Sequence, residues 1–294
     1  MQPRAAGYYT TTMRGLHWLM IVLPLLLAGC PSGDDAARQN GATDQGSAAK
    51  QAEPAEALVV WADPLLKEPL AGLADKFKAQ YAPGYVLLFL ERAELVARMT
   101  AAEPPSAPDV FIVADVQTLV ALRDSGVIDE ASARTFAGDT LALVQPAGAG
   151  YGTATLFDIY KLRFDKLAVG AQDTSVGYYA WQALVTEGCF KRLEDRLRHY
   201  ERTSELLDGF SSGAEELGII ATSQYVQADG LELVLRLGED LHEDIRYQAV
   251  AAKGRGADEG AMRLLRFLAE DIGIQSKLEG FGLTDRQTAM VEDK

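Results

Sequence analysis

Short apolar runs alternate with amphipathic segments along this chain, and no other feature limits its possible folds as strongly. Nearly continuous apolar runs lie at Leu58–Trp61, Tyr85–Leu90 and Asp109–Val113, and each has the length of a strand buried on both faces. After the first run, apolar residues recur every three or four positions from Leu66 to Phe77, which is the spacing of one helix face. Such strands between amphipathic helices predict a parallel sheet covered by helices on both faces.

A second block with the same alternation begins at Thr140–Val144. Further strands are predicted at Leu167–Gly170, His199–Arg202 and Leu217–Ala221, and a late strand at Tyr247–Ala251 is followed by helical segments. The part of the chain after residue 56 is long enough to bury a sizeable core. It predicts an α/β protein, as one large domain or as two lobes.

The N-terminal segment is typical of an export signal. Arg14 precedes an apolar run, Leu16–Leu27, that is shorter than the roughly 20 residues of a membrane span. We therefore predict a signal peptide over residues 1–29. The two small residues directly before Cys30 resemble a bacterial lipoprotein signal, which implies that Cys30 is lipidated and becomes the mature N-terminus. A cysteine that follows a secretory signal by chance is the alternative.

Residues 30–56 are predicted to form a flexible tether. Between Pro31 and Ala57 there are no aromatic residues and no Val, Ile or Leu, so this segment has too little apolar surface to offset the entropy lost on ordering. A coil of this length spans on the order of 30 Å, which would hold a folded domain away from a membrane surface.

The composition argues against several function classes. The net charge of −14 does not suit a nucleic-acid partner, whose binding rests on neutralising phosphates, and it gives an anionic ligand no long-range attraction. The sequence has no H-E-x-x-H and no paired C-x-x-C motif; we predict no metal site, no cofactor and no enzymatic activity. Cys189 has no partner for an internal disulfide if Cys30 is lipidated, and its apolar surroundings predict a buried thiol.

Several segments resemble, in order, one known family. The most telling is APDVFIVAD at Ala107–Asp115, followed by SGVID at Ser125–Asp129; the family has a similar PADVFISAD run followed by GLID. Further similar segments are Leu58–Ala62, Phe136–Val144, which looks like a strand that crosses between lobes, Leu167–Gly170, Leu217–Ile220 and Gly280–Leu283. Their order and spacing together resemble the molybdate-binding proteins, which are periplasmic substrate-binding components of ABC transporters.

The resemblance implies a two-lobed type II periplasmic-binding-protein fold, in which each lobe is a mainly parallel sheet flanked by helices. It puts the first lobe at residues 57–138 plus 245–294, the second at 139–244, and the ligand in the cleft between them. It also implies an exported monomer that delivers a small anionic solute to an ABC transporter permease from the periplasmic or extracytoplasmic face of a membrane, held there by its lipid anchor. In such proteins, helix N-termini bind an oxyanion without a basic side chain.

Carried over onto this chain, the family's ligand-binding segments fall on four strand-to-helix turns. The candidate ligand-binding residues on these turns are Asp63, Leu65, Glu91, Arg92, Ser175, Val176, Ala221, Thr222 and Tyr225.

This chain departs from the family pattern at those turns. The family's first serine falls on Leu65, next to an aspartate that can itself accept the N–H groups an oxyanion would use. The family's GSSG segment falls on Leu90–Ala93, and its tyrosine falls on Ala221, with Tyr225 about one helical turn later.

Three functions stay open at this stage. The first is a lipid-anchored importer component that binds a molybdate-like or tungstate-like oxyanion. The second is a binding protein for another small solute, an organic acid or a zwitterion, with Arg92 holding a carboxylate and Asp63 or Glu91 holding a cationic group; alternatively, Arg92 is an exposed residue paired with Glu91 or Glu94. The third is a non-transport sensor or interaction lipoprotein on the same scaffold.

Overall fold

The computed structural model describes residues 56–82, 84–100 and 107–284 of the 294-residue chain. The predicted signal peptide, Cys30 and nearly all of the predicted tether lie outside the described residues. Within the described part, no helix is both long and apolar enough to cross a membrane.

The first sheet has the strand order β2-β1-β3-β10-β4. Its strands are β1 (Leu58–Ala62), β2 (Tyr85–Phe89), β3 (Val110–Val113), β4 (Arg134–Asp139) and β10 (Ile245–Ala251). The helices that follow or flank them are α1 (Lys67–Gln80), α2 (Arg92–Thr100), α3 (Val116–Asp124), α8 (Glu259–Glu270) and α9 (Ile272–Gly280). A short 3-10 turn, η1 (Pro64–Leu66), precedes α1.

The second sheet has the order β7-β6-β8-β5-β9. Its strands are β5 (Leu141–Pro146), β6 (Leu167–Gly170), β7 (Leu197–Tyr200), β8 (Gly218–Ala221) and β9 (Leu231–Arg236). Its helices are α4 (Ser175–Thr186), α5 (Phe190–Leu193), α6 (Thr203–Ser211) and α7 (Thr222–Gln227).

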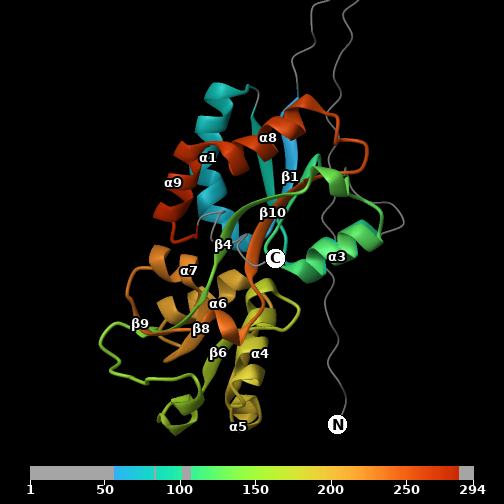
Figure 1. The fold of residues 1–294 in the computed structure, drawn as a ribbon. Helices are drawn as coiled ribbons and strands as arrows, with labels where there is room; N and C mark the ends of the chain where they lie inside the picture. Colours follow the sequence, from blue (N-terminus) through green and yellow to red (C-terminus); the bar gives the residue numbers. More distant parts are fainter. Residues whose placement is uncertain (1–55, 83, 101–106, 285–294) are drawn as a thin grey trace, which may run out of the picture. The chain divides into compact units, whose positions relative to one another are not determined.

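Each sheet is mainly parallel, as predicted, with one reversed strand. β10 runs antiparallel to both β3 and β4, and β5 runs antiparallel to both β8 and β9, while the other strands of each sheet share one direction. The chain passes between the sheets at Thr140 and again between Arg236 and Ile245. Figure 1 shows β4 and β10 side by side, leading from the first sheet toward the second.

Helices cover both faces of the first sheet. Alternate residues of β1 and β3 point to opposite faces: Val60 packs in the cluster that contains α1, α8 and α9 residues, whereas Trp61 and Phe111 pack with Leu95 of α2 and Leu122 of α3. In Figure 1, α1, α8 and α9 lie on one side of this sheet and α3 on the other. The turns that follow the carboxyl ends of β1, β2 and β3 carry Asp63, Glu91 and Asp115, which build the site.

The structure corrects three details of the sequence-based strand assignment. The predicted crossing strand Phe136–Val144 is two strands separated at Thr140, the predicted strand His199–Arg202 lies earlier, at Leu197–Tyr200, and Leu231–Arg236 forms a strand that was not predicted. Cys189 is buried and unpaired, as predicted.

Candidate functional site

An aspartate caps the turn after β1 by accepting a hydrogen bond from a backbone N–H group of the 3-10 turn that follows it. Asp63 is the N-cap of η1, and its Oδ1 accepts from the N–H of Leu65 at 2.9 Å. Pro64 at the first position of the turn has no N–H to donate. Only 5% of Asp63 is exposed, so this carboxyl group sits in a nearly dry environment.

Ser175 of the second sheet bridges two carboxyl groups of the first. It is the first residue of α4, and its Oγ lies 2.5 Å from Oδ2 of Asp63 and 2.7 Å from Oδ2 of Asp115. Asp63 follows β1 and Asp115 follows β3, so both come from the same edge of the first sheet. Contact between the two sheets at this point therefore runs through three polar side chains that are each at least nine-tenths buried.

The start of α4 is built for a close approach. Thr174 caps the helix by accepting from the N–H of Gly177 at 3.1 Å, and a Cβ atom on Gly177 would lie 1.9 Å from the carbonyl oxygen of Ala171. Ser175 and Val176 are the first two residues of α4, so their N–H groups have no acceptor within the helix. This end of α4 consequently presents N–H groups and the positive end of the helix dipole next to Ser175.

Asp115 is the better-satisfied member of the carboxyl pair. It caps α3 by accepting from the N–H of Thr118 at 2.7 Å, and it also accepts from the Thr118 hydroxyl at 2.7 Å. Nη1 of Arg92 lies 3.4 Å from its Oδ1. Nη2 of Arg92 donates to the carbonyl oxygen of Gln172 at 2.6 Å, across to the second sheet.

Two further buried carboxylates cap helices of the second sheet. Glu91, which follows β2, accepts from the N–H of Thr203 at 2.6 Å and from its hydroxyl at 3.3 Å, at the first residue of α6. Asp139, at the end of β4, accepts from the N–H of Ser223 at 3.2 Å and from its hydroxyl at 2.5 Å, near the start of α7. Tyr247 of β10 also donates to Asp139, at 2.9 Å.

Burial controls the protonation of these acids. Desolvation raises the pKa of Asp63 to about 7, against the hydrogen bonds from Ser175 and Leu65, which lower it. Desolvation likewise raises the pKa of Asp139 to about 6, and it raises the pKa of Glu91, against its bonds to Thr203. An uncompensated charge is disfavoured in such surroundings, so Asp63 titrates near neutral pH and Asp139 about one pH unit lower.

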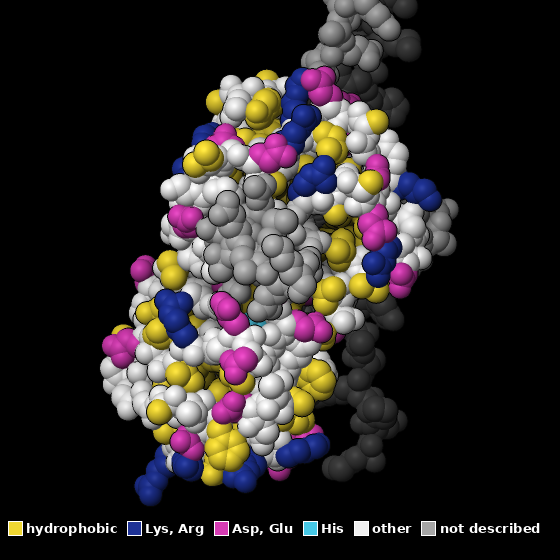
Figure 2. Space-filling view, in the orientation of Figure 1, with side chains coloured by type: hydrophobic (Ala, Val, Ile, Leu, Met, Phe, Trp, Pro, Cys, Tyr) yellow, Lys and Arg dark blue, Asp and Glu magenta, His cyan; other side chains and the backbone are white. Residues whose placement is uncertain are grey.

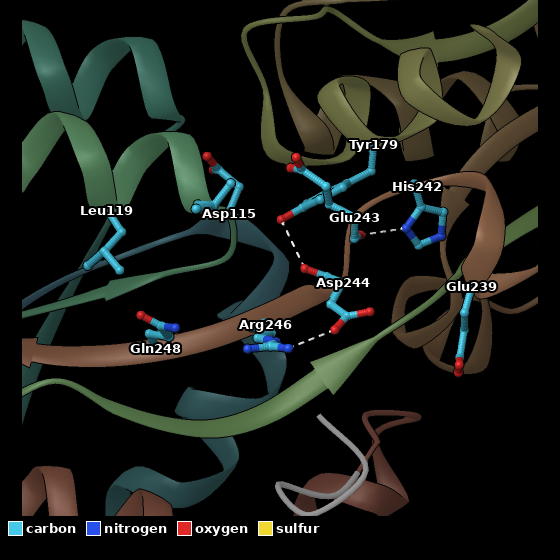
Figure 3. Close-up of a pocket in the computed structure, with 10 residues that line it drawn as sticks. Asp115, Leu119, Tyr179, Glu239, His242, Glu243, Asp244, Arg246 and Gln248 are labelled. Carbon is cyan, nitrogen blue, oxygen red and sulfur yellow. Dashed lines mark hydrogen bonds and ion pairs between the residues drawn. The ribbon is translucent and has the colours of Figure 1, made fainter. Parts of the chain in front are cut away.

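A cavity of about 420 Å³ lies beside Asp115 (Figure 3). It is lined from both sides of the contact between the sheets: by Asp115, Val116, Leu119, Tyr179, Glu239, His242, Glu243, Asp244, Arg246 and Gln248. Figure 3 shows Tyr179 directed at the backbone of Asp244, whose carboxylate binds Arg246 at 2.8 Å. Asp115 therefore belongs both to the lining of this cavity and to the buried cluster with Ser175.

The structure brings four of the predicted site residues to the contact between the sheets. Asp63, Glu91, Arg92 and Ser175 each make a hydrogen bond from one sheet's elements to the other's. The remaining predicted residues are used differently.

Those remaining residues contribute packing or, in the case of Thr222, a side-chain hydrogen bond. The side chains of Leu65, Val176 and Ala221 are buried in the main core, and Thr222 pairs its hydroxyl with that of Thr140 at 2.8 Å. Tyr225 packs against a separate cluster of the second sheet that contains Leu206 and Phe210.

Sequence reasoning did not single out Asp115, Asp139, Thr203, Ser223 or Tyr247 as site residues. Asp115 and Asp139 were open to prediction, because each directly follows or ends a strand of the first sheet, where turn residues gather. The others act on partners at least 84 residues away along the chain, and no local pattern signals such a pairing.

A catalytic sequence pattern and the surface charges do not indicate a further functional site in the described part of the chain. The G-x-S-x-G pattern at Gly209–Gly213 spans the C-terminal end of α6, rather than the strand-to-helix turn that a catalytic serine requires, and Ser211 donates to the carbonyl oxygen of Leu207 at 3.1 Å. On the face shown in Figure 2, both acidic and basic side chains are found among the described residues.

Comparisons with known proteins agree with this architecture. Over 202 residues, the chain is 26% identical to the molybdate-binding protein ModA of Escherichia coli strain K12, covering 67% of this chain and 77% of that protein. Among solved structures, the periplasmic molybdate-binding protein of Azotobacter vinelandii matches with a TM-score of 0.65 at 19% identity, covering 77% of this chain and 98% of that one. The substrate-binding domain of a putative molybdenum ABC transporter from Clostridium difficile matches with a TM-score of 0.62 at 21% identity, covering 78% and 98%.

A family model extends over nearly the whole described region. The model for the bacterial extracellular solute-binding proteins matches residues 58–282, from the first strand to the end of the last helix. This chain therefore belongs to the family of bacterial extracellular solute-binding proteins.

Proposed function

We propose that this chain is the lipid-anchored, extracytoplasmic solute-binding protein of an ABC importer, and that it binds a small oxyanion between its two sheets. The family is one of binding proteins, so the chain acts by binding and not by catalysis. In this proposal the two sheets are the cores of the two lobes predicted at 57–138 plus 245–294 and at 139–244, and the protein works as a monomer with a permease as its partner.

The assignment of an oxyanion as the ligand rests on one observation: the N-terminal ends of several helices meet where the two sheets are in contact. The starts of α4, α6 and α7 all face the first sheet there, and each contacts an acid: Asp63, Glu91 or Asp139. Helix N-termini favour negative groups through free N–H donors and the helix dipole. Positions that already hold carboxyl groups are suited to a small anion, and the relatives named for molybdate binding support that class.

Binding is tested by thermal unfolding of the mature protein, purified in detergent, with molybdate, tungstate, sulfate, inorganic phosphate and a panel of organic and amino acids. A ligand at 100 times its Kd that binds only the native state adds about 2.7 kcal/mol, which shifts the midpoint of a domain of this size by roughly 5 to 10 °C. Stabilisation by an oxyanion supports the proposal. Absence of any shift with the oxyanions contradicts it.

A second candidate is favoured by the charges at the site. Asp63 occupies the η1 N–H group that an oxyanion would use, and Arg92 supplies a guanidinium group nearby. A small organic acid or zwitterion suits that combination. Stabilisation by an organic or amino acid alone would favour this candidate.

The lipid anchor is a separate part of the proposal, and Cys30 carries it. We expect the native protein to sediment with the membrane fraction and a Cys30→Ala variant to be released from it. Equal membrane association of both proteins would contradict lipidation at Cys30.

A further inference from the structure

The bridge at Ser175 contains one more hydrogen-bond contact than its hydroxyl group can supply. A serine hydroxyl has one hydrogen, yet its oxygen lies 2.5 Å from a carboxyl oxygen of Asp63 and 2.7 Å from one of Asp115. If both acids were ionised, one contact would bring two oxygen atoms together with no hydrogen between them. The closed contact therefore contains an added proton on one of the two acids.

The surroundings assign that proton to Asp63. Asp115 already accepts from two donors on Thr118 and lies next to the Arg92 guanidinium group, so its charge is compensated. Among the described residues, Asp63 accepts from a single N–H group, that of Leu65. The chain of donors thus runs from the Asp63 acid to Ser175 Oγ, and from Ser175 to the Asp115 carboxylate.

The charged groups around Asp63 reinforce this arrangement. Glu91 and Asp115 both repel a negative charge on Asp63 and raise its pKa, as burial does more strongly. The negative charge of Asp63 raises the pKa of the Tyr247 phenol on β10. Arg92 is paired with Asp115 and not with Asp63. Ser175, on the α4 side, carries no titratable group.

We propose that Asp63 is the specificity-determining residue of this site and selects a tetrahedral oxyanion that carries its own proton, of the hydrogen phosphate class. The inference rests on the proposed function, since it names the anion for the same site. When a ligand enters between Ser175 and Asp63, one of its oxygen atoms replaces Ser175 Oγ as the hydrogen-bond partner of the Asp63 carboxyl group. Hydrogen phosphate donates its proton there to ionised Asp63, whereas sulfate and molybdate have no proton to donate.

The proton requirement predicts a difference in pH dependence. A fully deprotonated anion binds only when Asp63 itself is protonated, so above the pKa of Asp63, about 7, each bound sulfate or molybdate takes up about one proton. Its affinity then falls about tenfold for each pH unit above neutral. Phosphate retains a proton across this range, and its affinity changes far less.

The experiment is isothermal titration of the mature protein at about pH 6 and about pH 8 with inorganic phosphate, methyl phosphate, sulfate and molybdate. At the higher pH we expect phosphate to bind at least tenfold more tightly than sulfate or molybdate. Methyl phosphate distinguishes free phosphate from a phosphate ester: tighter binding of the ester at the lower pH would assign the site to an ester, and tighter binding of inorganic phosphate would assign it to the free anion.

The variant Asp63→Asn provides the decisive comparison. An asparagine amide donates a hydrogen bond at every pH, so this variant should bind sulfate with the same affinity at both pH values and lose the preference for phosphate. Asp258→Asn is the matched control, because Asp258 caps α8 in the same way, by accepting from the N–H of Ala261; its pH dependence should equal that of the native protein.

Three results would overturn the inference. Binding of sulfate or molybdate by the native protein with equal affinity at both pH values would do so while leaving the proposed function intact. An unchanged phosphate preference in Asp63→Asn would also do so. Binding of none of the four anions at either pH would overturn both this inference and the oxyanion in the proposed function. The native protein alone decides the first and third results if the variant fails to fold.

Discussion

The stability of this protein should fall as the pH rises through neutrality, and Asp63→Asn should remove a defined part of that fall. Asp63 has a pKa of about 7 in the folded protein, against 3.8 for an ordinary aspartate. A raised pKa means that the folded state holds the proton more tightly than the unfolded state. The stabilisation that Asp63 contributes is therefore complete below pH 3.8 and is lost as the pH rises through 7.

The size of the effect follows from these two values. Integrating the difference in bound protons lowers the free energy of unfolding by about 2.5 kcal/mol between about pH 5 and about pH 8. For a domain of this size, that corresponds to a fall in the melting midpoint of roughly 5 to 10 °C. Asparagine is nearly isosteric, stays neutral and can donate to Ser175, so Asp63→Asn should lack this contribution at every pH.

The assay is urea denaturation of both proteins across this pH range. The native protein also contains Asp139, whose raised pKa adds a fall of the same sign, so the informative quantity is the difference between the two proteins at each pH. Asp139→Asn is the matched control and should retain the Asp63 contribution. Parallel curves for the native protein and Asp63→Asn would refute the assignment of a buried, protonated carboxyl group at residue 63.

Three further outcomes test other parts of the structure. Gly177→Ala should destabilise the fold by more than about 3 kcal/mol in urea denaturation, because the added Cβ would lie 1.9 Å from the carbonyl oxygen of Ala171, whereas Gly152→Ala, whose Cβ would meet nothing within 4 Å, should change little. Cys189 should react with a thiol reagent only after unfolding, since burial raises its pKa to about 11; rapid labelling of the native protein, followed by mass spectrometry, would contradict this. Arg196→Lys should make the segment 160–164 sensitive to limited proteolysis, because the Arg196 guanidinium group binds the backbone carbonyl oxygens of Tyr160, Leu162 and Phe164 and an ammonium group cannot span them.

The sequence predicts the strands best where burial is complete. All residues of β3, β6 and β8 are buried, so each gives a continuous apolar run with a clear end. β9 was not predicted because it lies at the edge of the second sheet and its residues are partly buried or exposed. The break at Thr140 was also not predicted, because β4 and β5 are separated by this single residue and differ only in the sheet to which they belong.

Prediction of the site from the sequence was also incomplete: the turns were predicted, but the contacts between them were not. Asp63, Glu91 and Ser175 could be named in advance because the resemblance to the molybdate-binding proteins places the family's ligand-binding segments on their turns. Their partners could not, because Asp63 and Ser175 are 112 residues apart, as are Glu91 and Thr203. Such pairs depend on how the two sheets meet, and the burial that raises the pKa of Asp63 exists only once they have met.

Because the chain is negatively charged, the buried acids where the two sheets are in contact limit which anions this protein can bind. With a net charge of −14, the protein has no general attraction for an anion, and the contact between its sheets adds four buried acids: Asp63, Glu91, Asp115 and Asp139. Each is offset locally, by an N–H group at a helix start, a hydroxyl group or Arg92. A solute that enters must share those same donors with the acids. A proton held between Asp63 and the solute removes one negative charge from that competition, which is why the protonation state of the ligand, more than its size, should decide what this protein binds.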